Sequence, residues 1–149
     1  FSIQTNGLLI EKMYNKNKWL FDQLDTVGLS VDGCSKEVYE KLRRGGKFDI
    51  LESNLEFLAS IKKRHNFQIV FHCVVQKQNV HQLEDYTHFA YRFSADKIWF
   101  NRIVDWKTYE DFKSQDVALR DHEYHHVLKE QLEKIRNNRL VEFPTLDIV

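Results

Sequence analysis

The chain has 149 residues, of which 42% are hydrophobic, 30% charged and 13% aromatic. This composition is typical of a globular domain, and the length excludes a complete eight-fold barrel, which needs roughly 250 residues. Because 22 Lys and Arg balance 22 Asp and Glu, and no apolar run approaches a membrane span, neither a nucleic-acid partner nor a membrane is indicated.

The first predicted elements are a strand, a helix and a second strand. Residues 1–4 alternate between apolar and polar and predict a strand that ends at Thr5-Asn6-Gly7. Apolar positions between residues 10 and 24 predict one helix, and residues 25–31 form a short apolar run closed by Asp32-Gly33, a turn signal. The chain therefore begins within a strand, and we interpret it as a fragment of a longer protein.

Two helices and a buried strand are predicted next. Ser35 is suited to cap a helix that runs to Leu42, and a further helix from about residue 49 carries the inner stripe Leu51, Leu55, Leu58 and Ile61. Residues 67–75 have apolar positions at period two, and Val70 and Val74 on the other parity indicate burial on both faces, as in a parallel sheet.

The last third of the chain repeats the alternation. Asn79 with Gln82 resembles a capping box and predicts a helix whose inner residues are Leu83, Tyr86, Ala90 and Phe93. Residues 96–103 predict a strand, residues 122–137 a helix, and residues 140–143 a short terminal strand.

This alternation of strands and helices is typical of right-handed βαβ units and a parallel sheet. We expect an α/β fold of about four such units, followed by a helical extension that starts near Trp106. The two cysteines, Cys34 and Cys73, are too few for a disulfide framework, which favours a reducing, cytoplasmic compartment.

Ligands of parallel α/β folds bind at the carboxyl ends of the strands, so the polar residues just past each strand are the candidates for a site. They are Thr5 with Asn6, Ser30 with Asp32, residues 76–79, and Asn101 with Arg102. Taken one at a time, each group is explained as well by a turn or a helix cap.

Taken in order, these segments resemble the radical SAM superfamily. Thr5-Asn6-Gly7 looks like the TNG of that family's third strand, and residues 26–33 look like its fourth-strand SxDG segment. Residues 35–46, 48–58, 74–79 and 96–100 are similar to the stretches that follow in the family. The resemblance covers about residues 1–105 and is nearest to peptide-modifying, maturase-like enzymes of the SPASM/twitch type.

The resemblance implies a partial (β/α)6, TIM-like barrel. Residues 1–105 would be the C-terminal half of that barrel, strands three to six, and residues 106–149 a helical extension leading to an accessory region. The resemblance also implies that the intact parent is an enzyme with a [4Fe-4S] cluster. It would cleave S-adenosyl-L-methionine (SAM) reductively and abstract hydrogen from a substrate, with a peptide or protein as the candidate.

The resemblance also implies roles for single residues. Ser30 would hydrogen-bond the methionyl part of SAM, and Arg43 would pair with its carboxylate, to which a guanidinium offers a planar fork. The opening of the same SAM site would be lined by Thr5, Asn6 and Asp32, and the adenine would pack against Ile103 or Val104. His72 and Asn101 could face a substrate, although a structural role is the favoured interpretation for both.

One departure from the family pattern is large. The C-x3-C-x2-C loop that holds the cluster in this family would precede Phe1, and Cys34 and Cys73 do not replace it. We therefore expect no bound cofactor and no SAM cleavage in a chain of this sequence alone.

Two alternatives from other function classes stay open. His122-Glu123-Tyr124-His125-His126 matches H-E-x-x-H, in which His122 and His126 on a helix could share a zinc ion with Glu123 as general base. This is the weaker alternative, because no third ligand is evident. In the other, the chain is a non-catalytic scaffold or interaction fragment that self-associates through open sheet edges.

Overall fold

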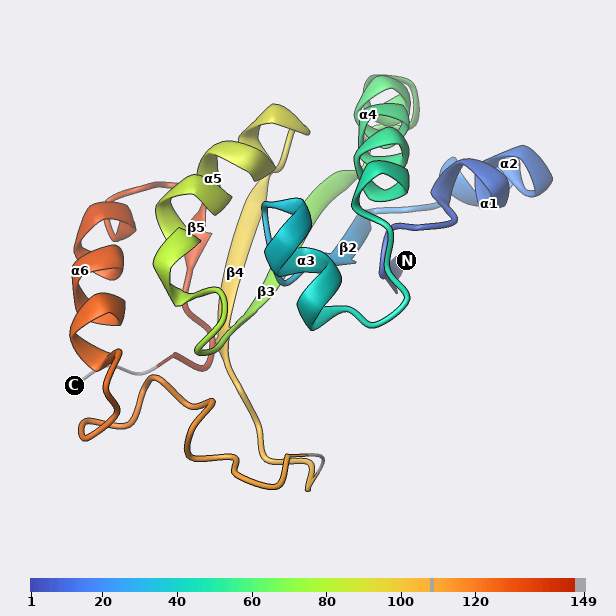
Figure 1. Ribbon diagram of the computed structural model, residues 1–149. Coiled ribbons are helices and arrows are strands. Elements are labelled where there is room, and N and C mark those ends of the chain that lie inside the picture. Colours follow the sequence, from blue (N-terminus) through green and yellow to red (C-terminus); the bar gives the residue numbers. More distant parts are fainter. Residues whose placement is uncertain (108, 147–149) are drawn as a thin grey trace.

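Five parallel strands form one sheet in the computed structural model, which describes residues 1–107 and 109–146. The strands are β1 (Ser2–Thr5), β2 (Thr26–Ser30), β3 (Gln68–Val75), β4 (Lys97–Arg102) and β5 (Val141–Glu142). Their spatial order, β1-β2-β3-β4-β5, is also their order along the chain. Successive right-handed crossovers between such neighbours place the connecting helices on one face of the sheet, as Figure 1 shows.

The connecting helices lie close to where the sequence predicts them. They are α1 (Ile10–Lys16), α2 (Lys18–Phe21), α3 (Lys36–Leu42), α4 (Phe48–His65), α5 (Leu83–Arg92), which follows the 3-10 turn η1 (Val80–Gln82), and α6 (His125–Ile135). Ser35 caps α3 as predicted, since its Oγ accepts the N–H of Val38 at 3.5 Å. The single helix predicted over residues 10–24 is wrong, because Asn17 has a non-helical backbone (φ −141°, ψ 56°) that separates α1 from α2.

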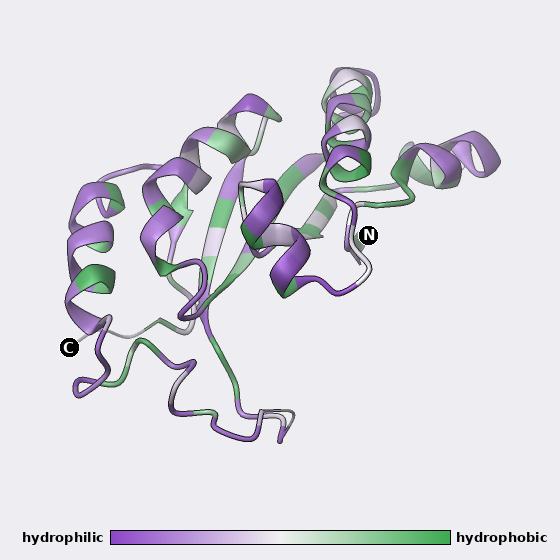
Figure 2. Ribbon diagram, viewed as in Figure 1, coloured by the Kyte–Doolittle hydropathy of each residue, from purple (hydrophilic) through white to green (hydrophobic). Residues whose placement is uncertain are grey.

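The core lies between the helices and one face of the sheet. On β3, Ile69, Phe71, Cys73 and Val75 are buried against the helices, and the predicted stripe of α4 from Leu51 to Ile61 is buried as well. Figure 2 shows the corresponding pattern, with bands of hydrophobic residues along otherwise hydrophilic helices. On the opposite face of β3, Val70 is buried but Val74 is only partly so, so the prediction of burial on both faces is confirmed in part.

No helix of the described residues covers this opposite face, which lines cavities instead. Ser30, His72 and Trp99 lie side by side on it, in register on β2, β3 and β4. A parallel sheet in chain order with helices on one face only is the arrangement of part of a (β/α) barrel. The predicted fold class, an α/β partial barrel, is thereby confirmed.

The residues after 105 extend the same sheet and the same layer of helices. Helix α6 packs against α5 and η1, and β5 pairs with β4, in agreement with the predicted terminal strand. The predicted division at residue 105 into barrel and extension stays a prediction, and residues 147–149 of that extension lie outside the described residues. Over the described ranges, no helix is long and apolar enough to cross a membrane.

Candidate functional site

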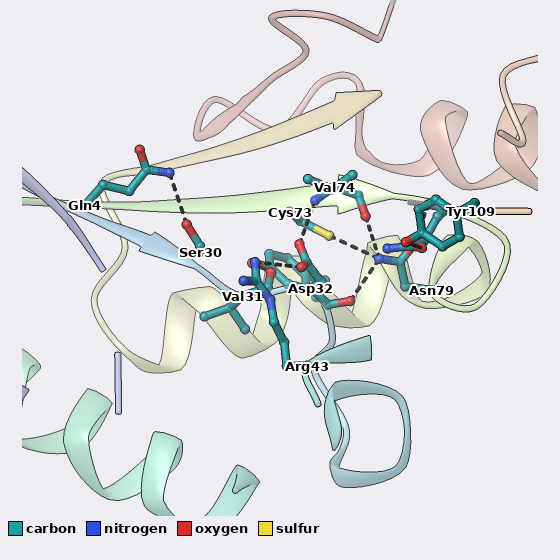
Figure 3. A network of polar contacts seen from close by, with 11 residues as sticks. Gln4, Ser30, Val31, Asp32, Arg43, Cys73, Val74, Asn79 and Tyr109 are labelled. Atoms are coloured by element: carbon teal, nitrogen blue, oxygen red, sulfur yellow. Dashed lines mark hydrogen bonds and ion pairs between the residues drawn. The ribbon is translucent and has the colours of Figure 1, made fainter. Parts of the chain in front are cut away.

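A network of polar contacts joins the carboxyl ends of β2 and β3. Asp32, two residues past β2, is only 7% exposed. One of its carboxylate oxygens accepts the N–H of Val74 at 2.9 Å, and the other lies 2.7 Å from Nη2 of Arg43 (Figure 3). Burial raises the pKa of the Asp32 carboxyl above its ordinary value, although the charge of Arg43 and the N–H of Val74 act in the opposite direction.

Arg43 reaches the network from the end of α3, and the turn after β2 fixes where that helix lies. A Cβ added at Gly33 would lie 2.7 Å from the backbone nitrogen of Tyr39, so this turn packs directly on α3. Nε of Arg43 is buried and has no hydrogen-bond partner among the described residues. The guanidinium therefore keeps donor capacity beyond its contact with Asp32.

Most of the predicted ligand residues line one of two adjoining cavities. Ser30, Asp32, Arg43 and Val104 line a cavity of about 530 Å³ on the helix-free face of the sheet, together with His72, Asn101, Trp106 and Tyr109. Arg43 and Asn6 line a second cavity of about 810 Å³, which also includes Arg44 and Tyr109. Arg43 thus lines both cavities, and its predicted contact with a bound carboxylate stays a prediction.

Three predicted residues have their polar groups engaged within the chain. Thr5 and Asn6 take the turn role that was their simpler interpretation, because Thr5 accepts the N–H of Gly7 at 3.2 Å and Asn6 accepts that of Leu8 at 3.1 Å. Ser30 Oγ accepts a hydrogen bond from Nε2 of Gln4 at 3.0 Å (Figure 3). A hydroxyl has further bonding capacity, so this contact leaves Ser30 able to bind a ligand.

Asn79 is one of the candidates just past β3 and belongs to this network, although a helix cap was its favoured interpretation. Its side chain does not cap η1, so the capping-box interpretation is wrong. Its Oδ1 accepts the N–H of Gln76 at 2.8 Å, and its Nδ2 donates to the carbonyl oxygens of Asp32 and Val74, both at 2.8 Å. The reason is burial: Asn79 is only 2% exposed, and an amide at that depth must satisfy the carbonyl groups around it.

The segment between β4 and α6 places aromatic side chains at the mouth of the site. Arg102 anchors it, through Nε and Nη2 contacts to the buried carboxylate of Asp116 at 3.1 and 2.6 Å. Tyr109 donates to Oε1 of Gln76 at 3.3 Å, and Trp106 is 77% exposed beside the cavity. The helical extension expected from Trp106 begins only at His125, because the described residues of this segment are positioned by these contacts rather than by a periodic apolar pattern.

The described residues contain no group of three His, Cys, Asp or Glu that could hold a metal ion. His122 lies before α6, which starts three residues later than predicted, so the helical spacing of the zinc alternative is not formed. The two ring nitrogens of His122 contact Ser114 O and Tyr124 N, both at 3.0 Å. Burial also raises the pKa of Cys34 to about 12 and that of Cys73 well above its ordinary value, which opposes thiolate ligation.

The sequence matches no protein-family model and no curated protein. The structure, in contrast, matches crystal structures of SuiB from Streptococcus suis. The chain shares the fold of part of SuiB. With the SAM-bound structure the TM-score is 0.66 at 17% identity, over 97% of this chain and 32% of SuiB.

Two further SuiB structures give the same result. The structure of SuiB bound to the precursor peptide SuiA has a TM-score of 0.66 at 15% identity, over 95% of this chain and 31% of that one. A SuiB structure whose description names no ligand has a TM-score of 0.65 at 16% identity. The chain therefore spans about a third of the length of SuiB, and at these identities the likeness concerns the fold.

Proposed function

We propose that this chain forms the SAM-binding part of the barrel of a maturase-like radical SAM enzyme. The observation that carries the proposal is that Ser30, Asp32 and Arg43, three residues singled out by the family resemblance, line one cavity at the carboxyl ends of parallel strands. The SAM-bound and peptide-bound SuiB structures support SAM as the ligand and a peptide as the substrate class.

In this proposal the residues that line the cavity have separate tasks. Arg43 binds the carboxylate of SAM through the donors that Asp32 leaves unused, and Ser30 hydrogen-bonds the methionyl part. Val104, 52% exposed and on the wall of the same cavity, covers the adenine. Trp106 and Tyr109 at the mouth contact the peptide. The intact enzyme would cleave SAM reductively and abstract hydrogen from that peptide.

The sequence led us to expect no bound cofactor in this chain alone, but its residues fit SAM, although they do not fit a [4Fe-4S] cluster. Arg43 lines both cavities and its guanidinium has donors beyond the contact with Asp32, which suits a carboxylate, whereas the two cysteines are buried or partly buried thiols with raised pKa values. The proposal therefore assigns the cluster ligands to a part of the protein outside this sequence. Both thiols are free, as is usual in the reducing cytoplasm, so we place the protein there in this proposal.

Calorimetric titration with SAM and with decarboxylated SAM tests the proposal. A charge-assisted hydrogen bond contributes about 1.5–3 kcal/mol, so removal of the carboxylate should weaken binding to the wild-type chain by roughly 10- to 150-fold. Arg43→Ala should bind both ligands equally weakly, because the carboxylate has then lost its partner.

Arg64→Ala is the matched control, because Arg64 is an exposed arginine near the end of α4, beside the amino-terminal end of β3 and thus far from the carboxyl ends of the strands. It should bind SAM as the wild type does. Wild-type chain that binds SAM and its decarboxylated form with equal affinity, or that binds neither, would contradict the proposed function.

A further inference from the structure

We infer that Asn79 and Asp32 act in series as positioning residues for Arg43. Asn79 fixes Asp32, and Asp32 fixes the guanidinium of Arg43, so that the remaining donors of the guanidinium are held ready for a carboxylate. The identity of the ligand rests on the proposed function, whereas the ordering of Arg43 is a property of the chain by itself.

The first step of the series is a closed ring of hydrogen bonds. Asn79 Nδ2 donates to the carbonyl oxygens of Asp32 and Val74, each at 2.8 Å. The N–H of the same Val74 donates back to the Asp32 carboxylate at 2.9 Å, as Figure 3 shows. Both the backbone and the side chain of Asp32 are thus fixed relative to β3, and the amide of Asn79 closes the ring.

The second step is the contact between Asp32 and Arg43. The Asp32 side chain is 10% exposed and the Arg43 side chain 33% exposed, so the 2.7 Å contact is largely shielded from water. A free arginine side chain loses rotamer entropy when a ligand orders it, and an arginine that is ordered beforehand avoids that loss on binding. Fixing Asp32 therefore increases the affinity of Arg43 for a carboxylate without any contact between Asn79 and the ligand.

A purely structural role for Asn79 is the interpretation to be excluded, and Asn54 provides the control. Asn54 is 8% exposed, and its Oδ1 accepts one backbone N–H, that of Glu11 at 2.9 Å. Its Nδ2 donates to two carbonyl oxygens, those of Leu8 and Ile50, at 3.3 and 2.9 Å. Asn54→Ala therefore removes the same three kinds of backbone hydrogen bond as Asn79→Ala, which in addition loses a 3.7 Å contact from Nδ2 to Cys73 Sγ, and it does so away from Asp32 and Arg43.

Nitrogen-15 relaxation of the arginine Nε–Hε groups in the full chain tests the ordering, with the Arg43 signal assigned by its loss in Arg43→Lys. The wild-type order parameter should be near that of rigid backbone, about 0.85, and should fall below about 0.6 in Asn79→Ala and in Asp32→Asn. Asn54→Ala should lower thermal stability as Asn79→Ala does, yet leave the Arg43 signal rigid. If Asn79→Ala does not fold, Asn79→Ser retains an oxygen acceptor, and Asp32→Asn still tests the second step.

SAM binding then tests the consequence for a ligand. Asn79→Ala should lose about tenfold in SAM affinity and almost nothing in affinity for decarboxylated SAM, because only the carboxylate contact is affected. A rigid Arg43 in Asn79→Ala, or an Arg43 loosened equally by Asn54→Ala, would overturn the inference. Absence of SAM binding in the wild type would contradict the proposed function alone, since the relaxation data decide the ordering of Arg43 without a ligand.

Discussion

Gly33→Ala is the substitution whose effect follows most directly from the structure. A Cβ at this position would lie 3.0 Å from the Cα of Tyr39 and 2.7 Å from its backbone nitrogen, and the shorter distance is closer than a Cβ approaches such an atom in folded proteins. Both obstacles belong to the backbone of α3, so no side-chain rotation relieves the clash and the helix itself must move. Because Arg43 directly follows the last residue of α3, the movement also displaces the guanidinium.

The cost should be that of an overpacked site, about 1–3 kcal/mol. In a chain of this size each kcal/mol lowers Tm by roughly 2–4 °C, so we expect a loss of about 2–12 °C in scanning calorimetry. SAM affinity should fall as well. Gly45→Ala is the contrasting variant, since Gly45 has open space around it but a φ of +78°, which gives a conformational cost near 1 kcal/mol.

Asn tolerates positive φ better than Ala, so Gly45→Asn should recover part of the loss that Gly45→Ala causes. At Gly33, where the obstacle is steric and φ is not positive, Asn should be no better than Ala. A Gly33→Ala chain that melts and binds SAM like the wild type would show that the turn after β2 does not set the position of α3.

Four further predictions concern other parts of the molecule. Tyr86→Phe removes the buried hydrogen bond to Val31 O at 2.7 Å and should lower the urea midpoint by an amount equivalent to about 1–2 kcal/mol with an unchanged m value; an unchanged midpoint would contradict this. Arg102→Lys loses the two-pronged contact with Asp116, so limited proteolysis should cleave between residues 103 and 124 faster than in the wild type, and equal rates would count against the anchor. Burial raises the pKa of Cys34 from 9.0 to about 12, so alkylation of Cys34 at pH 8 should be roughly a thousandfold slower in the folded chain than in the urea-unfolded chain. Because the unfolded thiol loses its proton first, the free energy of unfolding should fall as pH rises from 9 towards 12. Rapid alkylation of Cys34 in the folded chain would refute the burial argument. Strand β1 pairs on one side only among the described residues, so light scattering should give a mass that increases with concentration, whereas a dilution-stable monomer would speak against self-association.

Local patterns were enough to predict most of the fold. The period-two run before Val75 and the stripe from Leu51 to Ile61 predict β3 and α4, because burial on one face fixes a periodicity that can be read without tertiary information. The break at Asn17 was not predicted, since the apolar positions on either side of it fit a single helical period.

The candidate site was predictable only where its residues fall in motifs. Ser30, Asp32 and Arg43 belong to segments with family resemblance, and all three line the same cavity. Asn79 also ends a segment with family resemblance but was interpreted as a helix cap, because a local rule cannot detect that its amide faces the carbonyl oxygens of Asp32, past β2, and of Val74, on β3. Tyr109 lies in a segment with no periodicity, and its place beside Gln76 becomes visible only in three dimensions.

The bond between Asn79 and Asp32 also has a consequence for the order of folding. It joins residues 47 positions apart, so it can form only after β2 and β3 have paired across the whole α3–α4 crossover. The contact between Asp32 and Arg43, in contrast, spans a short stretch of chain and can form with α3 alone. A nascent chain would therefore acquire its arginine–aspartate pair early and its ordered guanidinium late, because non-local pairing is the slow step of such topologies. Ligand affinity would then report completion of the β2–β3 pairing rather than formation of the helix that carries the arginine.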